Sequence, residues 1–192
     1  MKKNKKALLA AMKGVRKGSR LEELVLSMVL QRIGNDNFEY DGDAIYTADG
    51  KKLVFCLSHA SRFKLREGVE TIGEMAFRGK QNLRAVVFPS SLKRIEKEAF
   101  YDCPLLDHVV LPASVRAVKQ YAFAECDSLS RITFLALPAR LGQHLFSGSD
   151  NLREVCVPKG MCAAFLASLG DKEEGHFSVK ESSVPSVGEP QE

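Results

Sequence analysis

The chain has 192 residues, of which 45% are apolar and 27% are charged, which is enough for one domain with a sizeable core. Residues 1–20 hold eight Lys or Arg and no acid, residues 21–170 hold 18 groups of each sign, and residues 171–192 hold two bases and six acids. We expect no membrane-spanning helix, since no run of 18 apolar residues occurs, and the balanced charge of the middle region argues against a nucleic-acid groove along it.

Residues 1–18 are predicted to be a basic flexible arm with two alternative roles. The arm either binds nucleic acid or anionic lipid with strong salt dependence, or it only keeps the chain soluble. The candidate polyanion-binding residues are Lys2, Lys3, Lys5, Lys6, Lys13, Arg16 and Lys17. The apolar stretch Ala7–Met12 is shorter than the core of a secretory signal, which favours a chain without a standard cleaved signal and a cytoplasmic location.

Residues 19–37 are predicted to form an N-terminal capping helix. Ser19 and Glu22 make a capping box, in which the two side chains satisfy free N–H groups of the first turn. Apolar residues then follow on one helical face, at Leu21, Leu24, Val25, Met28, Val29 and Ile33. We interpret this face as a cover for the first unit of the domain, and the alternative is a helix that binds a partner or a membrane surface.

Residues 38–58 are predicted to form a β-hairpin cap. Asp41-Gly42 and Asp49-Gly50 are turn signals, because Asp-Gly tolerates the positive φ that tight turns need. The second turn is flanked by the apolar stretches 44–46 and 53–55, which are the two strands of the expected hairpin.

Residues 59–170 repeat with a period of 23. The motif Ile72–Phe77 recurs at Ile95–Phe100, Val118–Phe123 and Leu141–Phe146. A Leu-x-x-Val-x-Phe stretch keeps the same register, at Leu83–Phe88, Leu106–Leu111, Leu129–Phe134 and Leu152–Val157, and Ala60, Phe63 and Leu65 lie one period earlier. Such a period indicates a solenoid, in which each unit buries its apolar side against its neighbours. This architecture favours an extended binding surface.

The whole pattern, strand-Pro-x-x-Leu-x-x-Ile-x-x-x-Ala-Phe-x-x-Cys-x-x-Leu, resembles the BspA-like leucine-rich repeat family. Cys103 and Cys126 occupy its cysteine position, and Lys80 and Ser149 replace that cysteine in the outer units. The resemblance covers about residues 38–170. It implies an α+β repeat solenoid, a right-handed coil with a parallel strand ladder, and a role in adhesion or host interaction at a cell surface. The location therefore has two readings, cytoplasmic from the first residues and cell-surface from the family.

The end of the chain divides into a helix and a tail. Met161–Leu169 is apolar and precedes Gly170, which predicts a short C-terminal helix. Residues 171–192 are acidic and then contain Ser, Pro and Gly, so we expect an acidic flexible tail.

The chemistry-bearing residues do not form a catalytic pattern. The five cysteines include no Cys-x-x-Cys pair and no zinc spacing, so no metal site or cofactor is expected. Cys103 and Cys126 lie one unit apart, about 5 Å, and buried free thiols are favoured over a disulfide. Cys156 and His108 would stand two units apart, about 10 Å, which exceeds hydrogen-bond reach. The prediction is a protein that is not an enzyme.

The strand side offers the most regular exposed surface. With Val86 and Phe88 facing inward, alternation places the residues between them on the outer side of the strand. The candidate partner-binding residues on this side are Val87, His108, Val110, Arg131 and Thr133. We therefore predict a protein–protein interaction module that binds through the strand side. The alternative is an intracellular scaffold anchored to nucleic acid or anionic membrane by residues 1–20.

Overall fold

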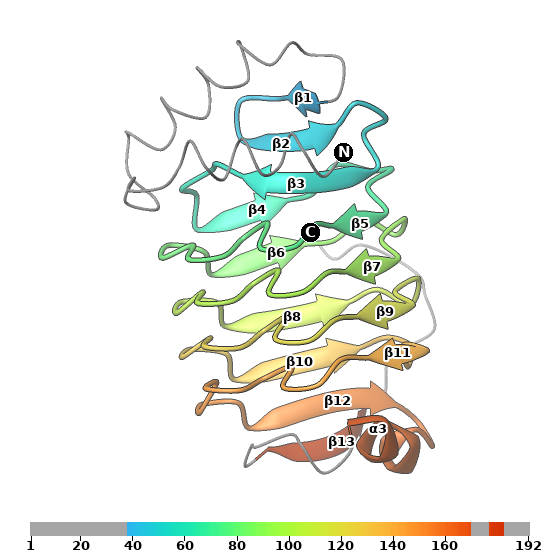
Figure 1. Ribbon diagram of the computed structural model, residues 1–192. Helices are drawn as coiled ribbons and strands as arrows, with labels where there is room; N and C mark the ends of the chain where they lie inside the picture. Colours follow the sequence, from blue (N-terminus) through green and yellow to red (C-terminus); the bar gives the residue numbers. More distant parts are fainter. Residues whose placement is uncertain (1–37, 170–176, 183–192) are drawn as a thin grey trace, which may run out of the picture.

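The computed structural model of the chain describes residues 38–169 and 177–182. These residues form a β-solenoid of about five turns with one short helix. The predicted arm and capping helix, residues 1–18 and 19–37, lie outside the described residues. Each coil contributes one strand to each of two parallel ladders that run along the molecule (Figure 1).

The first ladder begins with antiparallel strands and continues with short parallel ones. Its strands, in spatial order, are β1 (Phe38–Tyr40), β2 (Ala44–Thr47), β3 (Lys52–Cys56), β5 (Thr71–Ile72), β7 (Arg94–Ile95), β9 (Ala117–Val118) and β11 (Arg140–Leu141). The pairs β1–β2 and β2–β3 are antiparallel, and both predicted turns lie between these strands with Gly42 and Gly50 at positive φ. The predicted hairpin is therefore confirmed, and β1 extends it.

The second ladder contains the strands that the Leu-x-x-Val-x-Phe pattern predicts. They are β4 (Arg62–Lys64), β6 (Ala85–Val87), β8 (His108–Leu111), β10 (Arg131–Phe134), β12 (Glu154–Pro158) and β13 (Ser178–Ser182). β8, β10, β12 and β13 form one sheet, and β4 and β6 form a second. The N–H of Asp107 donates to the carbonyl of Arg84 at 3.2 Å and links the coils of β6 and β8. The predicted parallel ladder is confirmed.

A column of phenylalanines fills the space between the ladders. Phe77, Phe100, Phe123 and Phe146 are buried, and neighbouring rings stack at centroid distances of 4.7, 5.1 and 6.5 Å. Phe63 meets one end of the column edge-on at 5.3 Å, and Phe177 meets the other end at 5.7 Å. The aromatic column is the core of the solenoid.

The cysteine position of the repeat is a hydrogen-bond position. The thiol of Cys103 donates to the carbonyl of Phe77 at 3.1 Å, and the thiol of Cys126 donates to the carbonyl of Phe100 at 3.2 Å. One coil later the hydroxyl of Ser149 donates to the carbonyl of Phe123 at 2.8 Å. A donor side chain at this position gives a buried carbonyl a hydrogen-bond partner, and a buried carbonyl without one is costly. Ser149 supplies the same bond as the two cysteines.

The chain leaves the last repeat through a helix and returns as a strand. α3 (Cys162–Leu169) confirms the predicted C-terminal helix and buries Phe165 and Leu169. Ser178–Ser182 then pairs with β12 as the parallel strand β13. The expectation of a flexible tail over residues 171–192 is wrong for these five residues. Pairing with the exposed edge of β12 gives this polar segment its backbone hydrogen-bond partners.

Candidate protein-interaction surface

The structure brings the predicted strand-side residues together on the second ladder. His108 and Arg131 are direct neighbours in the pairing of β8 with β10, and so are Val110 and Thr133. Val87 lies one repeat before Val110, on β6. We call these five residues the strand face. Its position was predicted from alternation alone, because adjacent side chains of a strand point to opposite sides.

The apolar part of the strand face is open to solvent. Val110 is 51% exposed and Val87 is 37% exposed, whereas their neighbours Val109 and Val86 are buried. Thr133 is half-buried. Two exposed valines in register on neighbouring coils form a small apolar patch. A large exposed β-branched side chain is the type of group that a protein partner covers.

The charged part of the strand face is an ion-pair network. Arg131 lies 2.7 Å from the carboxylate of Glu154, which also pairs with Lys180 on β13. Hydrogen bonds from Lys180 and Arg131 hold the pKa of Glu154 below its usual range. The ring nitrogen Nδ1 of His108 lies 2.8 Å from the carboxylate of Asp107. The charged groups of the strand face are thus already partnered within the fold.

Glu154 and Lys180 extend the surface beyond the predicted residues. Lys180 pairs in register with Cys156, and Glu154 pairs with Arg131. The sequence pattern could have indicated Glu154, which lies one repeat after Arg131. It carried no signal for Lys180, because β13 has none of the repeat's residues.

Potential metal ligands do not cluster in the part of the chain that the structure describes. Residues 38–169 and 177–182 contain no cluster of three potential ligands from His, Cys, Asp and Glu. Cys56, Cys103 and Cys126 are buried free thiols, as predicted for the last two. Burial raises the pKa of Cys56 and of Cys126 to about 12, so both thiols are protonated at neutral pH and are poor nucleophiles. Within the same residues, no helix has the length and hydropathy to cross a membrane.

Several solved structures share this fold. They include a leucine-rich repeat protein from Eubacterium ventriosum, the T. pallidum leucine-rich repeat protein TpLRR and the pneumococcal vaccine antigen PcpA. The identities are 22%, 24% and 18%, and the TM-scores are 0.59, 0.53 and 0.54. The similarity covers 65%, 76% and 79% of this chain but only 34%, 64% and 49% of those chains. This chain spans less than two thirds of each, and the likeness shows the fold alone.

The repeat itself has a family. No curated protein is significantly similar to the chain. The BspA-type leucine-rich repeat region matches residues 51–163 in six copies, which is more than half of the sequence. The match includes the hydrogen-bonding cysteine position, the phenylalanine column and the strands from β3 to β12. The chain belongs to the BspA-type leucine-rich repeat family.

Proposed function

We propose that this chain is a non-enzymatic interaction module that binds a protein partner through the strand face. The observation that carries the proposal is the exposed pair Val87 and Val110 beside the Arg131–Glu154–Lys180 network. An apolar centre with a charged rim is the usual composition of a protein interface. The parallel ladder supports it, because extended solenoid surfaces commonly serve as binding sites.

The network on the strand face gives the partner a defined chemistry. Glu154 forms ion pairs with both Arg131 and Lys180. Because Glu154 is shared between two cations, a carboxylate of the partner can compete with it for the Arg131 guanidinium. The valines contribute burial on binding, at about 25 cal/mol for each Å² of apolar surface covered. A partner with an apolar side chain flanked by an acid fits both parts of the surface.

The test is a double change, Val110→Asp with Arg131→Glu, in the full-length chain. The partner is first trapped with a photo-crosslinking side chain at position 110 and is then purified for affinity measurement. We expect at least about a tenfold loss of affinity, because the change replaces an apolar contact and a cation by two anions. Circular dichroism must show that the double variant folds.

A matched control carries the same charge change at the far end of the solenoid. Lys159 and Ala163 are exposed near α3, and Lys159→Glu with Ala163→Asp should leave the affinity unchanged. An unchanged affinity in the folded Val110→Asp, Arg131→Glu variant would place the binding site on another surface. Equal losses in both double variants would show a general effect of charge.

A further inference from the structure

The described part of the chain is nearly neutral, but its cations are not evenly spread. Residues 38–169 hold 17 Lys or Arg and 15 Asp or Glu. On the first ladder, the coils of β7, β9 and β11 present exposed cations at Arg94, Arg116, Lys119 and Arg140. The overall charge balance, which argued against a nucleic-acid groove, does not show that these cations lie on one side of the solenoid.

Within the described residues, none of these four cations forms a close ion pair. The neighbouring Lys93 pairs with Glu70 at 3.1 Å and lowers the pKa of that carboxyl, and Arg94 lies near enough to Glu70 to help lower it. Cations without a partner raise the local positive potential and attract anionic ligands. They are therefore available to a ligand in a way that the partnered charges of the strand face are not.

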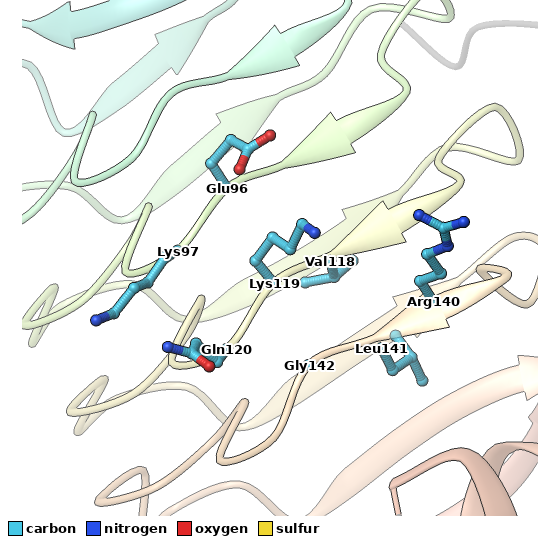
Figure 2. A pocket seen from close by; sticks show the side chains of 8 residues that line it. All are labelled: Glu96, Lys97, Val118, Lys119, Gln120, Arg140, Leu141 and Gly142. Carbon is cyan, nitrogen blue, oxygen red and sulfur yellow. The ribbon is translucent and has the colours of Figure 1, made fainter. Parts of the chain in front are cut away.

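A hollow lies beside two of these cations, Lys119 and Arg140. It has a volume of about 330 Å³ and is lined by residues from three successive coils, as Figure 2 shows. Val118 and Leu141 supply its apolar lining, and Lys97, Lys119 and Arg140 supply its cations. The remaining lining residues are Glu96, Gln120 and Gly142. We call this hollow the basic groove.

Gly142, which lines the hollow, allows two coils to approach each other closely. It stands one repeat after Lys119 and two after Glu96, and it is the only one of these three without a side chain. A Cβ at Gly142 would lie 2.1 Å from the backbone nitrogen of Gln120, so the last coil approaches the coil before it closely. A side chain at position 142 would therefore force these two coils apart beside Lys119 and Arg140.

We propose that the basic groove binds an extended acidic peptide segment of a partner protein. Charge complementarity favours an acidic ligand, since Lys119 and Arg140 flank an apolar lining and form no ion pair within the described residues. Lys97, in contrast, pairs with Glu98 at 3.2 Å. Coils repeat every ~4.8 Å, and carboxylates on one side of an extended peptide recur every ~7 Å, so one segment can meet cations of several coils. The amide of Gln120 offers hydrogen bonds to the peptide backbone.

The lining of the groove favours a peptide over other polyanions. Glu96 repels phosphates and carboxylates alike, but an extended peptide can place a neutral residue beside Glu96 and donate a backbone N–H to its carboxylate, which a continuous chain of phosphates cannot do. The groove has no aromatic side chain on which a nucleic-acid base could stack. It is a separate surface from the strand face, since it lies on the first ladder. If the basic groove did not bind an acidic peptide, the proposed function of the strand face would be unaffected.

The test measures fluorescence anisotropy of a labelled 12-residue peptide that alternates Glu and Ser, with a Gln–Ser peptide as the neutral probe. The full-length protein is compared with the double variant Lys119→Glu, Arg140→Glu. The control is Arg62→Glu, Lys64→Glu, which makes the same charge change at two exposed cations of β4. The basic residues 1–20 are present in all three proteins, so their contribution cancels.

We expect the groove variant to bind the Glu–Ser peptide at least about tenfold more weakly than the control variant, which should stay within about twofold of the wild type. The variant Lys119→Gln, Arg140→Gln should also lose affinity, and it provides the answer if the charge reversal does not fold. Equal losses in the groove and control variants would overturn the proposal, as would equal binding of the two peptides. Groove-dependent binding of a single-stranded oligonucleotide or a phosphatidylserine vesicle, without peptide binding, would also overturn it.

Discussion

The inside and the outside of this solenoid follow the same 23-residue period, but the residue type at equivalent positions is constant inside and varies outside. Inside, one column is phenylalanine in four successive coils, at positions 77, 100, 123 and 146. On the outer side of the strands, the equivalent position is Ala85, His108, Arg131 and Glu154 in four successive coils. An interior side chain packs against its equivalents one coil away, so the coil spacing fixes its size and shape. An exposed side chain meets water, and its identity is free to serve binding.

The largest expected effect comes from breaking the interior column. Phe123 is fully buried and stacks on Phe100 and Phe146, so Phe123→Ala should lower the free energy of unfolding by about 3–5 kcal/mol. Val110→Ala, which shortens an exposed valine, should change it by less than about 0.5 kcal/mol. Urea denaturation of both variants measures the contrast. A midpoint that hardly moves for Phe123→Ala would contradict the packing role of the column.

A smaller loss of stability is expected at Gly142, where two backbone segments are in close contact. Gly142→Ala would place a Cβ 2.1 Å from the nitrogen of Gln120, and separating the two coils should cost about 1–3 kcal/mol. Lys119→Ala is the matched control, because a side chain already stands at that point of the preceding coil. Urea denaturation again gives the difference. Equal stabilities would mean that the last coil moves away without cost.

The smallest effect concerns the thiols and depends on pH. Burial raises the pKa of Cys126 to about 12, whereas an unfolded thiol titrates near 8.5. Between these values the unfolded chain loses the proton and the folded chain keeps it, so this contribution reduces stability as the pH rises from about 8.5 toward 12. At pH 9.5 the thiol should lower the free energy of unfolding by ~1 kcal/mol relative to neutral pH.

Cys126→Ser removes this titration and keeps a donor, as Ser149 does one coil later. Denaturation at pH 7 and pH 9.5 should therefore show a smaller alkaline loss in the variant than in the wild type. Cys156→Ser, at a half-buried position on β12, controls for the loss of a cysteine. We also expect slow alkylation of Cys103 and Cys126 in the native protein. Identical pH profiles, or rapid native alkylation, would contradict the buried thiols.

The apolar stretch Met161–Leu169 before Gly170 predicted the terminal helix. The repeat period was sufficient to predict the strands of the second ladder as far as β12, because they depend on apolar residues at fixed spacing. It did not predict the parallel strands of the first ladder, such as Thr71–Ile72, because two residues are too few to show alternation. β13 was missed because its segment is polar, and it gains its order from the edge of β12. Ala60 was aligned with the buried Leu83 but is exposed.

The candidate surfaces divide in the same way. The strand face could be located from alternation along one strand, since Val110 and Arg131 each follow from the inward position of a neighbour. The basic groove could not be located, because Lys97, Lys119 and Arg140 occupy different positions of the repeat. They come together only through the path of each coil. Lys180 reaches Glu154 through a strand that the repeat does not encode.

The strand β13 also decides how the ladder ends. The terminal coil of a solenoid exposes N–H and C=O groups that can template another strand, so an uncovered edge invites aggregation. β13 covers the edge of β12 with a segment whose Ser178, Lys180 and Glu181 are exposed, and Glu181 accepts the N–H of Gly160 at 2.8 Å before α3. A further chain that paired with β13 would have to approach these charges. The repeat thus ends in a strand whose composition opposes fibrous growth.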